Sequence, residues 1–295
     1  MKKKILITGS SGFIGYLFLK DALEKNYHVV DILRDKNKKN EKLRKLKRLF
    51  PKSYKSIFFS KKENIHKKLK KKKFDIFVNF ATLYKNKHLN SEIPKFIDSN
   101  ITFPSIILDL VSNSAKKIIN FGTMMQHLDG KNYTSKNFYA STKSAFEMIL
   151  NYFSLSNKKL KFYNLKFFES FSENDSRNKL IPILYKNFKD NKTTYINSKN
   201  LELNIIHLDD ILKAIYIILN NNIKSGNYCL KNQKNIKIKN LIKSINLQSN
   251  KKLKIKFLGN RIYKPQKSFL KILPKWKADI TIKNKIEKNF LNENN

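Results

Sequence analysis

The segment from Gly9 to Gly15, Gly-Ser-Ser-Gly-Phe-Ile-Gly, constrains the fold of this chain more than any other segment. It follows residues 3–8, which read as a buried strand, and precedes residues 16–25, whose apolar side chains repeat with helical spacing. The chain has only seven glycines, and three of them stand within these seven positions. A strand, a glycine-rich turn and a helix in this order present backbone amides and a helix N-terminus to a phosphate. We therefore predict a dinucleotide-binding turn.

The three glycines of this turn have different expected roles. Gly9 permits the tight turn after the strand, Gly12 lets the backbone approach a pyrophosphate, and Gly15 lets the helix pack closely on the strand. Their spacing is G-x-x-G-x-x-G, which differs from the commoner G-x-G-x-x-G.

Strands and helices are expected to alternate through the first half of the chain. Further buried strands are predicted at 28–33, 57–60, 74–80, 118–121 and 160–168, and the two longest helices between them at 93–113 and 139–155. This alternation is typical of an α/β fold with a doubly wound parallel sheet.

After the sixth strand the alternation loosens, beginning with a polar loop at 169–177. We expect a small C-terminal lobe there that binds substrate. The predicted domains are 1–169 for the dinucleotide and 170–295 mostly for the substrate, with about 201–222 returning to the first domain.

The tip of the second strand indicates which cofactor is bound. An acidic residue at this tip holds the ribose hydroxyls of NAD, whereas an arginine accommodates the 2′-phosphate of NADP. Arg34 occupies the tip, and Asp31 lies too early in the strand to serve. We therefore expect NADP(H), with NAD(H) as the alternative if the strand ends one residue later and Asp35 is used instead.

Tyr139 and Lys143 lie four residues apart in a segment with helical periodicity, so both side chains project from one helix face. An ammonium group one turn away lowers the pKa of a phenol, which is otherwise too high for proton transfer at neutral pH. Thr123 follows the fifth strand and is placed to bind the substrate oxygen that Tyr139 would protonate. Taken alone, the Tyr-x-x-x-Lys pattern also fits a half-buried tyrosine beside a solvated lysine.

The formal net charge of +40 raises the alternative of a protein that binds nucleic acid. The basic residues are spread along the whole chain, however, and Lys, Asn, Ile and Phe are used heavily while Gly and Ala are scarce. This composition indicates an AT-rich genome rather than a polyanion-binding surface. The positive field would still attract an anionic substrate.

Other features exclude several classes of protein. No apolar run approaches the ~20 residues of a membrane span, and no signal peptide is recognised, so a cytoplasmic protein is expected. Cys229 is the single cysteine, which excludes an internal disulfide and fits a reducing compartment. No His/Cys/Asp group has the spacing of a metal site, and none is expected.

In their order along the chain, Gly9–Gly15, Asn79–Thr82, Asn100, Thr123 and the Tyr139/Lys143 pair resemble the extended short-chain dehydrogenase/reductases, the NAD-dependent epimerase/dehydratase family. These are Rossmann-fold enzymes that act on nucleotide sugars, and the resemblance covers nearly the whole chain. It implies Thr123, Tyr139 and Lys143 as the catalytic residues.

The resemblance also implies a set of binding residues. Together with Arg34, the residues implied to bind the cofactor are Gly9, Ser11, Gly12, Phe13, Ile14, Gly15, Asn79, Ala81, Thr82, Asn100, Tyr139, Lys143 and Phe168. The candidates for contacts with the sugar or the diphosphate are Gln126, His127, Glu169 and Arg177. For His127, a structural hydrogen bond within a loop is the alternative.

Residues 121–127 and 165–182 carry a narrower resemblance, to the branch of CDP-abequose synthase-like enzymes. Enzymes of that branch reduce the 4-keto group of a nucleotide-linked (CDP- or dTDP-) deoxyhexose in the synthesis of surface polysaccharide such as lipopolysaccharide O-antigen. The resemblance implies an NADPH-dependent oxidoreductase. Glu169 stands for the usual Asp of the branch, and residues 171–173 replace its Tyr-Gly-Pro.

Two alternative functions stay open. A 4-epimerase or dehydratase that retains its NAD would use the same scaffold. A non-catalytic relative that senses nucleotides or binds RNA is the alternative from another class, because of the charge. The resemblance also implies a homodimer formed through the helices at 93–113 and 139–155.

Overall fold

The computed structural model describes residues 2–34, 40–59, 62–69, 72–173, 175–261 and 267–280. The chain divides into two compact units. The first comprises Met1–Lys166 and Ile215–Tyr228, and the second comprises Phe167–Ala214 and Cys229–Asn295. The segment that returns to the first unit therefore overlaps the expected 201–222 only from residue 215 onward.

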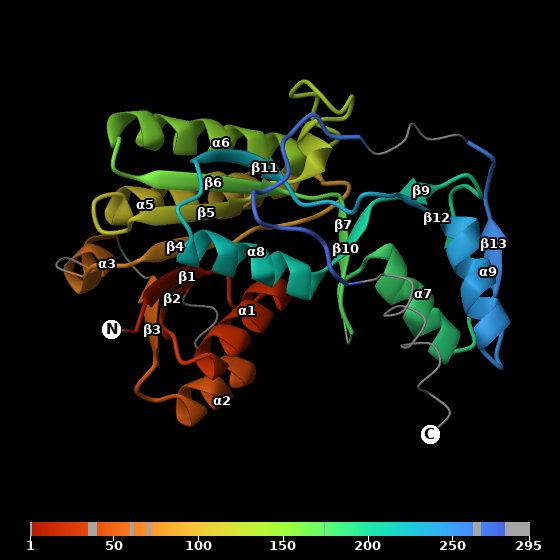
Figure 1. Ribbon diagram of the computed structural model, residues 1–295, viewed down its shortest axis with the longest axis horizontal. Coiled ribbons are helices and arrows are strands. Elements are labelled where there is room, and N and C mark those ends of the chain that lie inside the picture. Colours follow the sequence, from red (N-terminus) through yellow and green to blue (C-terminus); the bar gives the residue numbers. More distant parts are fainter. Residues whose placement is uncertain are drawn as a thin grey trace. The chain divides into compact units, whose positions relative to one another are not determined.

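The first unit is built on a seven-stranded sheet with the order β11-β6-β5-β4-β1-β2-β3 (Figure 1). All neighbouring pairs from β6 to β3 are parallel. Because the chain runs outward from β1 in both directions, the strand order reverses between β1 and β4, and this confirms the predicted doubly wound sheet. The strands are β1 (Lys4–Thr8), β2 (His28–Arg34), β3 (Tyr54–Phe59), β4 (Ile76–Asn79), β5 (Lys117–Phe121), β6 (Lys161–Lys166) and β11 (Gly226–Cys229).

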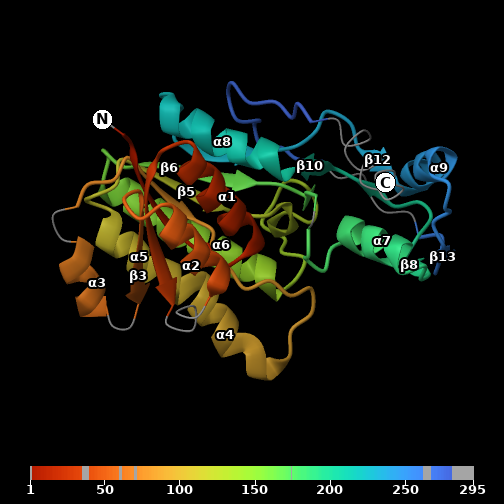
Figure 2. The ribbon, with the colours of Figure 1, turned by 90° about the horizontal axis from the view of Figure 1, so that it is seen from below.

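Helices cover both faces of this sheet, which is why its central strands are nearly continuous apolar runs. Helices α3, α5 and α6 pack into one core cluster with the strands, and the Phe18 ring of α1 lies 5.8 Å from the Tyr216 ring of α8 on the other face. Figure 2 shows α1 and α8 together on one side and α3 and α5 on the other. The helices of this unit are α1 (Phe13–Glu24), α2 (Glu41–Leu49), α3 (Lys62–Leu69), α4 (Ile93–Ile97), α5 (Phe103–Val111) and α6 (Phe138–Ser156), with the second half of α8 (Leu208–Asn220).

The predicted helix at 93–113 is present but is interrupted in its middle. Between α4 and α5 the residues Asp98–Thr102 form a π-helical turn, η3. The short 3₁₀ turns η2 (Asn90–Glu92) and η4 (Met124–Gln126) complete the connections of the first unit. Such π-helical turns are frequent at functional sites.

The second unit has its own core, formed by apolar side chains of two helices and several short strands. Its strands pair two by two, β7 with β10 and β8 with β13 in parallel, and β9 with β12 antiparallel. The elements are β7 (Glu169–Phe171), α7 (Leu180–Lys189), β8 (Thr194–Ile196), β9 (Glu202–Leu203), β10 (Ile205–His207), the first half of α8, β12 (Ile236–Lys237), α9 (Ile238–Gln248) and β13 (Ile255–Phe257).

Two sequence predictions differ from the structure. The segment 169–177 was expected to be a polar loop throughout, but its first three residues form β7, because they pair with the apolar strand β10. The third strand begins at Tyr54 and not at 57, since Tyr54 is buried against its neighbours. Among the helices that the structure describes, none combines the length and the apolar character needed to cross a membrane.

Candidate active site

The glycine-rich turn joins β1 to α1 and leaves the first helix without a side-chain cap. Gly9 has φ +80°, and a Cβ there would collide with the backbone of Ala81. A Cβ at Gly15 would collide with the carbonyl of Gly9, whose oxygen accepts a 3.0 Å hydrogen bond from the amide of Gly12. Ser11 and Gly12 are exposed at the open side of the turn. The turn therefore presents the N-terminus of α1, which no side chain caps, as a pyrophosphate site requires.

A buried carboxyl group supports the turn from β2. Ser10 donates to Asp31 Oδ2, and the hydroxyl of Tyr54 donates to the same oxygen over 2.8 Å. Oδ1 of Asp31 has no hydrogen-bond partner among the described residues. Burial raises the pKa of Asp31 to about 7, although both hydrogen bonds act in the opposite direction. Asp31 therefore holds the turn from inside the sheet.

Arg34 ends β2, as predicted, and is partly exposed. Its Nη1 donates to the hydroxyl of Ser99 over 2.9 Å and lies 3.6 Å from Asp98 Oδ2. Both partners belong to the π-helical turn, which fixes the direction of the guanidinium group. Asp35, the alternative acidic residue at this tip, lies outside the described residues.

Asn79 was predicted to line the cofactor, but its side chain is committed to the interior of the sheet. Its Oδ1 accepts from Thr8 over 2.7 Å, and its Nδ2 donates to Asn120 over 3.1 Å. Asn120 in turn donates to Asn164 over 2.9 Å. These four residues face one another in the register of β1, β4, β5 and β6, so the buried ladder pairs polar side chains between strands. Nδ2 of Asn164, at the end of the ladder, has no partner among the described residues.

Asn100 connects the end of β4 to α6. Its Oδ1 accepts from the amide of Leu83 over 2.6 Å and from the hydroxyl of Thr82 over 3.2 Å. Its Nδ2 donates to the carbonyl of Leu83 and to the hydroxyl of Thr142. Asn100 is buried and its amide is fully used in this way, so it positions two elements and offers no group to a cofactor.

Tyr139 and Lys143 both lie in the first turns of α6, whose N-cap is Asn137. The ring of Tyr139 is half-buried and packs edge-on against the exposed Tyr84 at 4.9 Å between centroids. Lys143 is 2% exposed, and its ammonium makes no hydrogen bond or ion pair with any residue that the structure describes. Burial lowers the pKa of Lys143 to about 8, and the nearby charge of Glu147 partly opposes this effect.

Thr123 follows β5 and caps the short turn η4. Its hydroxyl oxygen accepts from the amide of Met125 over 3.2 Å, and its own amide donates to Gln126 Oε1 over 2.9 Å. The hydroxyl proton takes no part in the capping bond, so it can be donated to an incoming oxygen.

Gln126 and His127 were candidates for substrate contacts, but the structure buries both. Gln126 is 0% exposed and donates to Glu147 Oε2 over 2.8 Å. His127 lies between the carbonyl of Asn132 at 3.0 Å and the ammonium of Lys166 at 2.8 Å. The contacts of His127 thus fit the alternative of a structural hydrogen bond within a loop. Gln126 likewise makes its hydrogen bonds inside the protein.

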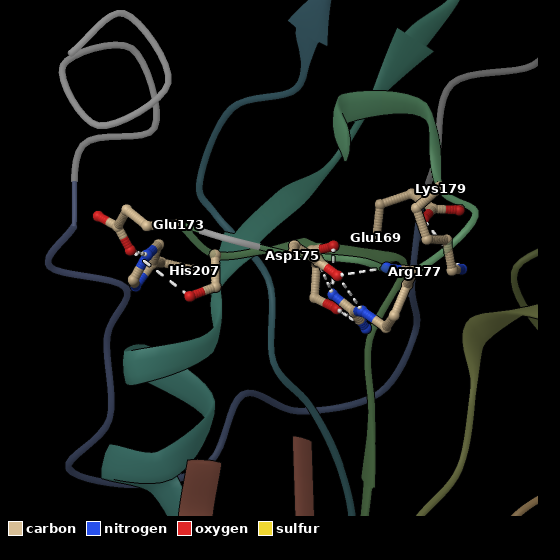
Figure 3. Close-up of polar contacts among 8 residues, drawn as sticks. Glu169, Glu173, Asp175, Arg177, Lys179 and His207 are labelled. Carbon is tan, nitrogen blue, oxygen red and sulfur yellow. Dashed lines mark hydrogen bonds and ion pairs between the residues drawn. The ribbon is translucent and has the colours of Figure 1, made fainter. Parts of the chain in front are cut away.

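Phe168, Glu169 and Arg177 belong to the second unit. Arg177 makes a two-pronged contact with Asp175, 2.8 Å and 2.6 Å long, and also donates to the carbonyl of Ser170 (Figure 3). Glu169 forms an ion pair with Lys179 at 3.2 Å. Each of these two candidate residues is therefore one member of an ion pair. The sequence analysis named Glu169 and Arg177 but not their partners Lys179 and Asp175.

The sequence reasoning overlooked Glu147 and Lys166, which form an ion pair inside the first unit. A signal was available for the first of them, because Glu147 follows Lys143 by one helical turn and shares its face. Among the described residues, no three His, Cys, Asp or Glu side chains gather as a metal site would require.

The family described as "NAD dependent epimerase/dehydratase family" matches residues 5–230 of this chain. Relatives named CDP-abequose synthase also match. The one from Yersinia pseudotuberculosis is 28% identical over 224 residues, which cover 74% of each chain. The one from Salmonella muenchen is 23% identical over 261 residues, 87% of this chain and 84% of the relative.

Two solved structures share the fold over nearly their whole length. UDP-glucuronic acid 4-epimerase from Bacillus cereus, in complex with UDP-glucuronic acid and NAD, superimposes with a TM-score of 0.79 at 18% identity, covering 97% of this chain and 98% of that one. MoeE5, in complex with UDP-glucose and NAD, gives a TM-score of 0.77 at 13% identity, covering 97% of each chain.

Proposed function

The chain belongs to the NAD dependent epimerase/dehydratase family, and within that family we propose that it reduces the 4-keto group of a CDP- or dTDP-linked deoxyhexose with NADPH. As a member, it is an NAD(P)-dependent enzyme that acts on a nucleotide sugar. The two relatives named CDP-abequose synthase support the finer reaction. The observation that carries the proposal is the buried side chain of Lys143, which lies on the same helix face as Tyr139 and makes no hydrogen bond or ion pair with the described residues.

The first unit supports a dinucleotide site, because its tight turn between β1 and α1 can form only while Gly9 and Gly15 lack a Cβ. We assign the uncapped N-terminus of α1 at this turn to the pyrophosphate and Lys143 to the nicotinamide ribose. A lone buried lysine is costly to charge, and a ribose hydroxyl would give it the missing hydrogen bonds. When bound, the nicotinamide supplies the hydride.

Tyr139 is the proton donor in this proposal. The ammonium of Lys143, whose pKa of about 8 keeps it mostly charged at neutral pH, favours the phenolate of Tyr139 and so makes the phenol a better acid. Thr123 holds the carbonyl oxygen with its hydroxyl proton, since the capping bond uses only the oxygen. The carbonyl oxygen stays bonded to C4 of the sugar and becomes a hydroxyl group that carries the proton of Tyr139.

Arg34 is the reason for proposing NADPH over NADH. A guanidinium group binds a phosphate with two parallel hydrogen bonds. Among the described residues, Arg34 contacts Ser99 and Asp98 through Nη1 alone. Ser99 keeps the group at the tip of β2, where the second ribose of a dinucleotide is bound.

Glu169 and Arg177 are our proposed contacts for the sugar and the diphosphate. Their present partners, Lys179 and Asp175, belong to the same short segment. An anionic diphosphate would compete with Asp175 for the guanidinium group of Arg177, because both offer paired oxygens.

Purified protein should be incubated with CDP- and dTDP-linked 4-keto-deoxyhexoses and with either NADPH or NADH. We expect oxidation of NADPH that depends on one of the two sugars, with one equivalent of alcohol formed per equivalent of cofactor. Protein that retains NAD and interconverts epimeric sugars without net oxidation would show an epimerase instead. Salt-sensitive RNA binding with no turnover would show a non-catalytic relative.

A further inference from the structure

A buried ion pair lies behind the turn that begins at Thr123. Lys166 Nζ, at the end of β6, is 2.8 Å from Glu147 Oε2 on α6, and both side chains are 0% exposed. Removing two charges from water is so costly that apolar residues of similar volume are often at least as stable. Stability is therefore a weak explanation for this pair, and its contacts point to a geometric role.

Three side chains from the segment 126–133 bind the pair. Gln126 Nε2 donates to Glu147 Oε2 over 2.8 Å, and the hydroxyl of Tyr133 donates to Oε1 over 2.6 Å. His127 Nε2 lies 2.8 Å from Lys166 Nζ. Because the carbonyl of Asn132 requires a proton on Nδ1 of His127, Nε2 is the acceptor in that contact. Both carboxylate oxygens and the ammonium group are thus engaged by one segment.

Gln126 carries this contact to Thr123. Its Oε1 accepts from the amide of Thr123 over 2.9 Å. The packing around this bond leaves no room at Gly122, where a Cβ would lie 2.7 Å from Gln126 Oε1 and 2.8 Å from Lys166 Cγ. The position of Thr123 therefore depends on a side chain that the ion pair holds.

Glu147 connects the same network to the other half of the site. It stands one turn after Lys143 on α6, and its charge favours the charged form of that lysine. The carboxylate of Glu147 therefore accepts hydrogen bonds from the segment that positions Thr123, and its charge also favours the charged form of Lys143.

We propose that Glu147 and Lys166 are positioning residues, which hold the turn of Thr123 in register with the Tyr139–Lys143 face of α6. This role rests on the proposed function, because it concerns the hydroxyl, phenol and ammonium groups that we assign to catalysis. Neither Glu147 nor Lys166 is required to touch the substrate.

The test replaces the pair by apolar residues of similar volume, Glu147→Leu together with Lys166→Met. We expect this variant to fold. Neither residue is assigned to a contact with the cofactor, so NADPH binding should change only through Lys143, which loses the nearby charge of Glu147. Its kcat should fall by about 10-fold to 100-fold, with a smaller change in KM, because misplacing a reacting group costs rate rather than binding. Amides of residues 122–128 should exchange hydrogen faster than in the wild type.

A second variant covers the case in which the double variant does not fold. Glu147→Gln keeps the size of the side chain but has one acceptor oxygen for the donors of Gln126, Tyr133 and Lys166. The turn must therefore shift, and the same losses are expected.

Lys117→Met is the matched control. Lys117 is a half-buried lysine that donates to the carbonyls of Ile218 and Asn221, so its loss should lower Tm and leave kcat unchanged.

Two results overturn the proposal. One is a kcat equal to that of the wild type in the folded variant, and the other is unchanged hydrogen exchange in residues 122–128. If the wild type turns over none of the sugars, the proposed function fails, and the exchange measurement still decides whether the pair positions the turn.

Discussion

The side-chain amide of Asn100 donates to the hydroxyl of Thr142 over 2.9 Å, and that hydroxyl donates to the carbonyl of Tyr139 over 2.7 Å. Since Asn100 also binds Leu83 through both its amide and its carbonyl, it joins the end of β4 to the first turn of α6. The π-helical turn places Asn100 between these two elements. Asn100 is therefore connected to the backbone of Tyr139 through the hydroxyl of Thr142.

Replacement Asn100→Ala removes these contacts and leaves buried groups of Leu83 and Thr142 unpaired. We expect a loss of about 1–3 kcal/mol in unfolding free energy and a kcat reduced by about tenfold or more. Thr142→Val, which removes only one of the bonds to Asn100, should show a smaller effect on both. Urea unfolding and steady-state kinetics measure the two quantities, and equal kcat values in Asn100→Ala and wild type would show that α6 needs no such support.

Replacement Tyr139→Phe removes the proposed proton donor and keeps the ring that packs against Tyr84. The rate should fall by at least about 10²-fold, as is typical when a general acid is lost. Binding of NADPH, followed by fluorescence titration, should stay close to that of the wild type. A variant with full turnover would exclude Tyr139 as the acid.

Replacement Arg34→Leu removes the proposed contact with the 2′-phosphate. The KM for NADPH should rise by about tenfold or more, because a charge-assisted pair to phosphate is lost, while the KM for NADH should change little. The ratio of kcat/KM for the two cofactors measures this preference directly. Lys25→Met, at an exposed ion pair near the end of α1, is a control that should leave the ratio unchanged.

Asp31→Asn should change how stability depends on pH. Burial raises the pKa of Asp31 from 3.8 to about 7. Between these values the folded chain keeps a proton that the unfolded chain releases, so stability is lost as pH rises and stays lower above about pH 7. The asparagine keeps one oxygen for Ser10 and Tyr54 and has no such loss. Relative to the wild type, the variant should gain up to a few kcal/mol between about pH 4 and pH 7.

Urea unfolding of both proteins at a series of pH values measures this difference. The other titratable groups contribute equally to the pH dependence of both proteins, so their contributions cancel in the difference. A stability difference that stays constant across the range would mean that Asp31 titrates normally in the folded chain.

Local patterns allowed much of the fold and part of the site to be predicted. The glycine spacing and the position of Arg34 after an apolar strand are properties of short segments, and the structure places them at the predicted turn and strand end. The helical spacing of Tyr139 and Lys143 was equally local, and both lie on α6. Their catalytic roles stay predictions.

Contacts between distant segments could not be predicted in this way. His127 is buried because Lys166 reaches it from β6, and nothing near His127 in the sequence indicates that contact. Asp31 was judged only by its distance from the strand tip, whereas its environment comes from Ser10 and Tyr54 on neighbouring elements. Similarly, β7 forms because Ser170 pairs with Ile206 of a strand that follows much later.

The most direct measurement uses NADPH labelled with deuterium at C4 of the nicotinamide and a CDP-linked 4-keto-deoxyhexose. We predict one deuterium bound to C4 of the sugar product for each NADPH oxidised, seen by mass spectrometry and NMR. An unlabelled product formed without net oxidation of NADPH would contradict ketoreduction.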